Sequence, residues 1–268
     1  MGRTIEEQLK HAKNRLAGSR IPSARLDSEL LLAHALKTNR EYILAHSDQV
    51  LTKNQQTTFE GFIEKRAQRL PLVHLTGKKE FYGLDVSITA DVLTPRVETE
   101  TMVDWAINSA PKGSRVLDMG TGSGALAIAL AKHRPDLKLT ASDISEQALQ
   151  VARQNALSHK LNIKFIHSNM WQNINGTFDI IVCNLPYLKT DAELLPEVKN
   201  EPGVALFGGN DGLELYREFF LRIQTFLNPT GIVYTECDPW QQEKLANIAT
   251  TSGLVKVRED YFIMEFKN

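Results

Sequence analysis

A short peptide at residues 184–187 offers the clearest set of groups for chemistry. It reads Asn184-Leu185-Pro186-Tyr187 and follows an apolar run from Phe178 to Cys183. That run is short and β-branched in its middle, which predicts a buried parallel strand. Ligands of open α/β sheets bind beyond the carboxyl ends of such strands. The peptide therefore places an amide, a main-chain carbonyl and an aromatic ring beside a predicted crevice.

These groups suit the methylation of a planar NH2 group. The lone pair of an amide or exocyclic amino nitrogen is delocalised, so the nitrogen is a poor nucleophile unless two acceptors hold its hydrogens. Asn184 offers its side-chain carbonyl and Leu185 its backbone carbonyl, while Tyr187 offers a flat wall. Asn and Pro are also common turn residues, so a purely structural role for Asn184 and Pro186 explains the peptide alone equally well.

A glycine-rich segment upstream predicts a nucleoside site. The segment Gly120-Thr121-Gly122-Ser123-Gly124 lies between a predicted strand, 116–119, and a predicted helix, 125–132. Such a turn lets a ligand approach the backbone at a helix N-terminus, and Asp143 ends the next predicted strand, where its carboxylate can bind both ribose hydroxyls. The glycines fit both a dinucleotide loop and an S-adenosylmethionine (AdoMet) loop. Asp118 is the acid expected near a sulfonium, or else a cap at the strand end.

The third predicted strand ends in Ser168-Asn169-Met170-Trp171. At the same edge of the sheet, Asn169 can contact an adenine amine, and Met170 or Trp171 its face. Trp171 as an ordinary core aromatic is the alternative.

Composition describes an ordinary globular chain. Of its 268 residues, 42% are hydrophobic and 24% charged, and the net charge is −1. The chain lacks a long apolar run and a signal-peptide core, so we expect no membrane span and a cytoplasmic protein. Cys183 and Cys237 lie in apolar runs and are expected to be buried and reduced. No Cys or His cluster has metal-ligand spacing, so no metal is expected.

The pattern of the chain predicts three parts. Residues 1–70 form a small helical domain, with capping boxes at Thr4 and Thr52 and with Leu26, Leu30 and Leu31 as the apolar stripe of its second helix. Within residues 71–95, the residue types alternate as they do in strands, beginning with the segment 73–77. This pattern predicts a linking β-hairpin. Residues 96–268 alternate strand and helix, which predicts a parallel sheet, with a helix at 212–227, a fifth strand at 232–237 and a closing antiparallel pair. The fold class is α/β.

Taken in order, these motifs resemble the HemK/PrmC family of release-factor glutamine methyltransferases, within the class I AdoMet-dependent methyltransferases. The resemblance runs over nearly the whole chain. It includes the segments 24–33 (ARLDSELLLA), 80–83 (EFYG), 92–100 (VLTPRVETE) and 209–213 (GNDGL). This many ordered matches are far more specific than the glycine turn alone.

The resemblance implies a Rossmann-like class I methyltransferase sheet, a small N-terminal helical domain and a linking hairpin. It implies transfer of a methyl group from AdoMet to N5 of the glutamine in the Gly-Gly-Gln motif of peptide-chain release factors. AdoMet would bind to Asp118, the turn from Gly120 to Gly124, Asp143, Asn169, Met170 and Asn184. The glutamine would bind to Asn184, Leu185, Pro186 and Tyr187, and the helical domain would bind the rest of the release factor. We expect a monomer without stable nucleic-acid binding.

Two departures keep alternatives open. The family has Asn-Pro-Pro-Tyr, whereas Asn-Leu-Pro-Tyr resembles the rRNA adenine dimethyltransferases, so an rRNA or DNA amino (N6-adenine type) methyltransferase is the second hypothesis. The excess of acidic over basic side chains after residue 75 argues against it. The C-terminal segment 258–261 lacks the usual glycine and arginine, which leaves a binding protein with a decayed site as another reading. A nicotinamide oxidoreductase would leave Asn184 to Tyr187 unexplained.

Overall fold

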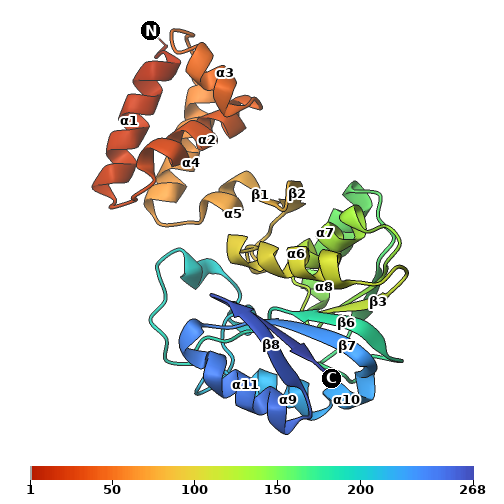
Figure 1. The fold of residues 1–268 in the computed structure, drawn as a ribbon. Helices are drawn as coiled ribbons and strands as arrows, with labels where there is room; N and C mark the ends of the chain where they lie inside the picture. Colours follow the sequence, from red (N-terminus) through yellow and green to blue (C-terminus); the bar gives the residue numbers. More distant parts are fainter. Residues whose placement is uncertain (1) are drawn as a thin grey trace. The chain divides into compact units, whose positions relative to one another are not determined.

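The computed structural model describes residues 2–268, which form two compact units (Figure 1). The helical unit comprises residues 2–78 and Leu194–Asn200, and the sheet unit comprises Lys79–Glu193 and Glu201–Asn268. Each unit is described by itself below. The division at residues 70 and 95 that the sequence predicts stays a proposal.

The helical unit packs five helices around its own apolar core. Both predicted capping boxes are present: Thr4 caps α1 with Glu7, and Thr52 caps α4 with Gln55. The core gathers fully buried side chains such as Ile5, Leu31 and Phe59. The helices are α1 (Ile5–Gly18), α2 (Ala24–Leu36), α3 (Arg40–Ala45), α4 (Lys53–Ala67) and α5 (Leu72–Thr76).

The stripe predicted for α2 is wrong at Leu26, whose surface is 43% exposed. The helix instead buries Asp27 and Glu29 beside Leu31. These acids lie inside because arginines reach them: Arg66 Nε donates to Asp27 at 2.7 Å, and Arg25 and Arg40 donate to Glu29. Apolar spacing alone therefore misjudged which face of the helix is inside.

The predicted strand at 73–77 is also wrong, because these residues form the short helix α5. Pro71 precedes its first residue, and Gly77 ends it in the left-handed region at φ 71°. The hairpin itself is present downstream, as β1 (Lys78–Phe81) and β2 (Leu84–Ser87). Its two turn residues, Tyr82 and Gly83, both have positive φ, as a two-residue hairpin of type I′ requires.

The sheet unit contains a seven-stranded sheet in the order β5-β4-β3-β6-β7-β9-β8. Strands β3 to β7 pair in parallel, and β9 pairs antiparallel with both β7 and β8, so the predicted α/β class and closing pair are confirmed. The strands are β3 (Arg115–Met119), β4 (Lys138–Asp143), β5 (Lys164–His167), β6 (Phe178–Cys183), β7 (Leu227–Glu236), β8 (Val255–Asp260) and β9 (Ile263–Lys267).

Helices cover both faces of this sheet. Figure 1 shows α6 (Glu100–Ser109), α7 (Ala125–His133) and α8 (Glu146–Ser158) over one face, and α9 (Glu214–Leu221), α10 (Ile223–Phe226) and α11 (Gln242–Thr251) over the other. The helix predicted at 212–227 is broken at Arg222, and β7 begins five residues before the predicted strand at 232. Short 3-10 turns occupy Val97–Thr99, Val198–Asn200, Gly203–Ala205 and Pro239–Gln241.

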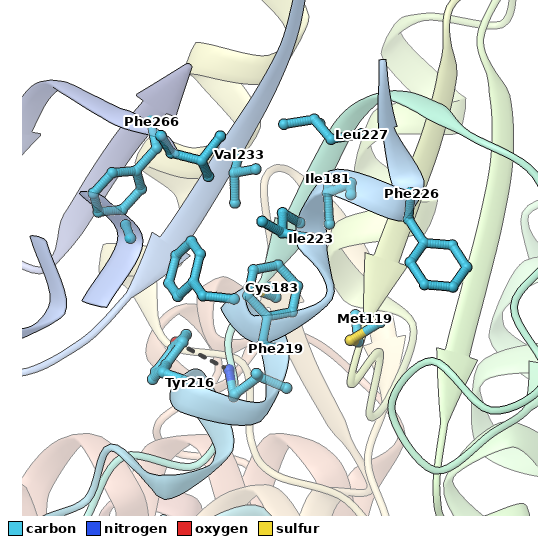
Figure 2. Close-up of a cluster of buried hydrophobic side chains, with 14 of the residues drawn as sticks. Met119, Ile181, Cys183, Tyr216, Phe219, Ile223, Phe226, Leu227, Val233 and Phe266 are labelled. Atoms are coloured by element: carbon cyan, nitrogen blue, oxygen red, sulfur yellow. Dashed lines mark hydrogen bonds between the residues drawn. The ribbon is translucent and has the colours of Figure 1, made fainter. Parts of the chain in front are cut away.

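One continuous part of the core lies on the face under α9 to α11. Figure 2 shows Phe219, Ile223 and Phe226 packed with side chains of β6, β7 and β9. Both cysteines are buried and free, as expected. Tyr216 lies in the same cluster, and the dashed line at its hydroxyl shows that this apolar layer also makes a polar contact.

The strand order places a ligand site. From β3 the chain moves outward through β4 to β5, then returns to the other side of β3 at β6. Loops that follow β3 and β6 therefore leave in opposite directions and open a crevice between them, which is the usual ligand site of such sheets. Within residues 2–268, no helix combines the length and the apolar character that spanning a bilayer requires.

Candidate active site

The glycine turn after β3 is held by β4. The backbone N–H groups of Gly120 and Thr121 both donate to the carbonyl of Ser142, at 2.8 and 2.9 Å. Gly124, at φ 82°, lies so close to α8 that a Cβ there would come within 3.0 Å of the Cβ of Ala152. A Cβ on Gly122 would instead meet no heavy atom of the described chain within 4 Å, so this residue faces open space. The turn thus offers bare backbone to a ligand.

Asp143 at the end of β4 is bound to this turn. Its Oδ2 accepts from Gly122 N at 2.8 Å, and its Oδ1 accepts from Ser145 N at 2.9 Å, at the start of α8. Burial raises the pKa of Asp143, although these backbone donors act in the opposite direction. Each carboxylate oxygen keeps a lone pair for a further donor, as the predicted contact with a ribose requires.

Asp118 lies beneath the turn. It is fully buried, and its Oδ2 accepts from the Thr121 hydroxyl at 2.6 Å and from Ala127 N at 3.3 Å. Burial raises the pKa of this carboxyl to about 7, while the bonds from Thr121 and Ala127 act to lower it. Asp118 is not among the described residues that line the main cavity, so its predicted contact with a cofactor stays a prediction, and its visible role is to support the turn.

The corner after β5 separates the two candidates for contact with the adenine face, Met170 and Trp171. Asn169 and Met170 line the main cavity, and Met170 adopts a positive φ of 46°. Trp171 turns into the core, where its ring stacks on Phe226 at 4.5 Å between centroids and its indole N–H donates to Phe219 O. The structure therefore supports the core interpretation of Trp171.

These elements line one partly open cavity of about 150 Å³. Gly120, Gly122, Asp143 and Asn184 line it. Two acidic side chains, Asp91 and Asp143, are among its described lining residues, and no basic side chain is. A site for a pyrophosphate would want a cation, whereas this lining suits a ligand with positive charge.

A second, smaller cavity adjoins the first. Thr99, Thr121 and Ser123 line only the second, whereas Leu93, Gly120, Gly122 and Asn184 line both. Asn184 thus stands where two cavities meet beside the glycine turn. This is the arrangement that transfer between two bound molecules needs.

The peptide 184–187 is held by groups that the sequence did not single out. Asn184 Nδ2 donates to the Thr99 hydroxyl at 3.2 Å, and Tyr187 OH donates to Glu236 Oε1 at 3.1 Å. Two further contacts fix the backbone of the peptide: Leu185 N donates to Tyr216 OH, and Gln241 Nε2 donates to Tyr187 O. Burial and the Glu236 carboxylate raise the pKa of Tyr187, so its hydroxyl stays protonated.

Leu185 packs where the family pattern has a proline. Its side chain is 4% exposed, and its Cδ2 would lie 3.2 Å from a Cβ on Gly120. The leucine therefore fills the space that this glycine leaves open and joins the peptide to the turn. Its backbone carbonyl and Asn184 Oδ1 accept no hydrogen bond within residues 2–268. Pro186 also lines the main cavity, whereas Tyr187 does not.

Of the groups that sequence reasoning missed, Glu236 carried a visible signal. It is a carboxylate in an otherwise apolar strand end, 232–237, and a buried acid at the ligand edge of a sheet indicates function. Thr99, Tyr216 and Gln241 carried none, because hydroxyls and amides are common on helices. No group of described residues could hold a metal ion.

Comparison with known proteins identifies the family of the chain. Residues 7–77 match the PrmC N-terminal domain, and residues 99–200 match the methyltransferase small domain. The release factor glutamine methyltransferase of Deinococcus radiodurans is 37% identical over 96% of this chain and 94% of its own length. That of Geobacter sulfurreducens is 36% identical over 93% of this chain and 89% of its own length.

Among solved structures, a methyltransferase from Pyrococcus furiosus shares the fold of the sheet unit. Its TM-score is 0.53 and its identity 19%, over 70% of this chain and 90% of that one. The predicted class I methyltransferase fold is thereby confirmed, and so is the resemblance that the motifs indicate. The chain belongs to the release factor glutamine methyltransferase family.

Proposed function

We propose that the protein transfers a methyl group from AdoMet to the side-chain amide nitrogen of the glutamine in the Gly-Gly-Gln motif of peptide-chain release factors. The observation that carries this proposal is the position of Asn184. It lines both adjoining cavities, and its side-chain carbonyl oxygen accepts no hydrogen bond from residues 2–268. The release factor as substrate is taken from the names of the relatives.

The residues of the main cavity fit AdoMet. Gly122 leaves room for a ligand against the backbone, and Asp143 presents both carboxylate oxygens beside it. The acidic lining suits a sulfonium, and Asn169 and Met170, which line the same cavity, are the proposed contacts of the adenine. When bound, AdoMet supplies a methyl group on a positively charged sulfur. Asp143, Asn169 and Met170 remain proposed contacts.

The chemistry then depends on two acceptors from this chain. Asn184 Oδ1 and the Leu185 carbonyl each accept one hydrogen of the substrate NH2 group, which fixes the amide plane and directs the nitrogen lone pair toward the methyl carbon. As the N–C bond forms, the bond from that carbon to the sulfur breaks and leaves a neutral thioether, so the nitrogen gains positive charge and its N–H becomes acidic. The two oxygens stabilise that charge until the proton leaves for water, so no strong base is needed.

Binding of the whole substrate involves more of the chain. We assign the rest of the release factor to the helical unit, which carries more basic than acidic side chains up to residue 75. A monomer, a cytoplasmic location and the absence of stable nucleic-acid binding stay predictions.

Tritiated AdoMet tests the proposal directly. The full chain is incubated with a release factor, with the same factor carrying Ala in place of the Gln of its Gly-Gly-Gln motif, or with rRNA. We expect label in the first factor alone. Label in rRNA alone, which the Asn-Leu-Pro-Tyr sequence leaves open, or equal label in both factors would refute the proposal.

An Asn184→Ala variant extends this assay. Because it removes one of two acceptors, it should lower kcat by about 10²-fold or more. AdoMet affinity, measured by equilibrium dialysis, should change little, since most of the cavity lining is untouched. A proportional loss of both would contradict the role given to Asn184.

A further inference from the structure

Glu236 is a buried acid that the proposed chemistry does not use directly. It ends β7, is 1% exposed, and has no arginine, lysine or histidine in ion-pair contact within the described chain. Burial raises its pKa and nearby Glu98 adds to that, while the Thr99 and Tyr187 hydroxyls, which bond to it, and the nearby Asn184 amide act to lower it. A carboxylate kept without a cation needs another reason to be there.

The directions of its hydrogen bonds give that reason. Thr99 Oγ1 donates to Glu236 Oε2 at 2.6 Å, and Tyr187 OH donates to the other oxygen, Oε1. A hydroxyl has one hydrogen, so Thr99 has none left to give. Toward Asn184, at 3.2 Å, the Thr99 oxygen can therefore only accept.

An acceptor at this point selects one orientation of the Asn184 amide. The NH2 group must face Thr99, and the planar side chain then turns Oδ1 to the opposite side. With Glu236 ionised, this holds whichever way the amide atoms are named, because it follows from the single hydrogen of Thr99. Were the amide reversed, an NH2 group would face the substrate NH2 group, and two donors cannot bond to each other.

We propose that Glu236, acting through the Thr99 hydroxyl, fixes the amide orientation of Asn184 and thereby presents Oδ1 to the substrate nitrogen. Glu236 and Thr99 are positioning residues. Only the expected effect on kcat rests on the proposed function; the orientation of the amide does not. Tyr187 supports the same arrangement, because it occupies Oε1 and leaves Oε2 to Thr99.

Thr99→Val and Thr99→Ser form a matched pair for the test. Valine keeps the shape of threonine without the hydroxyl, and serine keeps the hydroxyl without the methyl group. With a release factor as substrate, we expect Thr99→Val to lower kcat by about tenfold or more, with the Kd for AdoMet nearly unchanged. Thr99→Ser should retain kcat within about threefold of the wild type, which a merely structural role of the side chain would not produce.

A second measurement needs no turnover. In protein with 15N-labelled asparagine, the side-chain NH2 resonances of Asn184 should shift in Thr99→Val and in Glu236→Gln, and stay in place in Thr99→Ser. The buried Asn155 amide, bonded to Ser87 and Ser123, serves as the control and should not move.

The outcomes separate the two proposals. Wild-type protein that fails to methylate a release factor removes the proposed function, while the resonances still decide the orientation of the amide. Unshifted Asn184 resonances in Thr99→Val, or equal losses of kcat in the valine and serine variants, would overturn the inference about Glu236.

Discussion

The helical unit and the part of the sheet unit next to the glycine turn and the peptide 184–187 both bury carboxylates, but they surround them with different partners. In α2, Glu29 lies between Arg25 and Arg40, and Asp27 bonds to Arg66. Next to the site, Asp118 and Glu236 accept hydrogen bonds only from neutral donors within residues 2–268: hydroxyls and a backbone N–H.

The pKa values of these buried acids differ according to their partners. Burial of Glu29 acts to raise its pKa, yet the two arginines outweigh it and the pKa lies below the ordinary value. For Asp118 and Glu236 burial prevails and the pKa values are raised. Away from the cavity the sheet unit also pairs its buried acids, Glu201 with Arg96 and Glu265 with Arg258. Unpaired buried acids are therefore a property of the site, where a carboxylate must direct neutral donors instead of neutralising a cation.

Among variants of the buried acid–arginine pairs in the helical unit, Arg66→Met should have the largest effect on stability. It leaves Asp27 buried without its cation, which should lower the free energy of unfolding by about 3–5 kcal/mol. Urea denaturation measures this, and AdoMet affinity should not change because only sheet-unit residues line the cavity.

The matched control removes both charges. In Asp27→Leu/Arg66→Met no lone charge is left inside, so most of the lost stability should return. If the double variant is as unstable as Arg66→Met, the packing of the arginine stem and its bonds to Leu70 and Glu197, rather than its pairing with Asp27, stabilise the helical unit.

Among the buried acids without an arginine partner, Asp118 should make stability depend on pH, and Asp118→Asn should remove that dependence. Asp118 keeps its proton up to about pH 7 in the folded chain but only to about 3.8 when unfolded, so unfolding releases a proton between these values. Raising the pH through this window therefore destabilises the wild type, by about 1.4 kcal/mol per pH unit at most, or roughly 2–3 kcal/mol from pH 5 to 7.

Asparagine mimics the protonated acid and has no such dependence. Unfolding free energies of both proteins, measured across pH 5 to 7, should thus diverge, with the wild type falling relative to Asp118→Asn. Parallel curves would mean that Asp118 ionises normally and that the contrast with the helical unit is false.

A smaller effect is expected from Asp143→Asn, which bears on the division of labour within the site. The amide can accept from Gly122 N or Ser145 N but not from both, and it loses the charge that suits a ribose. AdoMet Kd should rise by about tenfold or more, with kcat at saturating AdoMet nearly retained. Asn184→Ala should do the reverse, so equal losses of cofactor binding in the two variants would count against separate roles.

Much of the sheet unit could be predicted because its signals are local. The glycine turn, Asp143 and the peptide 184–187 each follow a strand directly, so finding the strand was enough to place them at one edge of the sheet. Capping boxes at Thr4 and Thr52 span four residues and were found for the same reason.

What escaped prediction depends on contacts between distant residues. Thr99 and Glu236 are 137 positions apart, and their pairing exists only once the crossovers are made. Asp27 and Arg66 are 39 apart, so nothing near Asp27 in the sequence shows that this face of α2 is inside. At residues 73–77 a short alternation fitted strand and helix alike, and Pro71 and Gly77 decided it.

The smallest effect should come from Arg25→Ala. Arg25 is 73% exposed and four residues before Glu29, the geometry of a surface helix pair, which contributes about 0.3–0.5 kcal/mol. Glu29 keeps Arg40, whose Nε lies 2.6 Å from Oε2, so the buried carboxylate stays paired. Urea denaturation should therefore show a barely measurable loss. A loss as large as that of Arg66→Met would mean that Glu29 needs both arginines, and that a single cation does not separate the paired acids of this unit from the unpaired acids of the site.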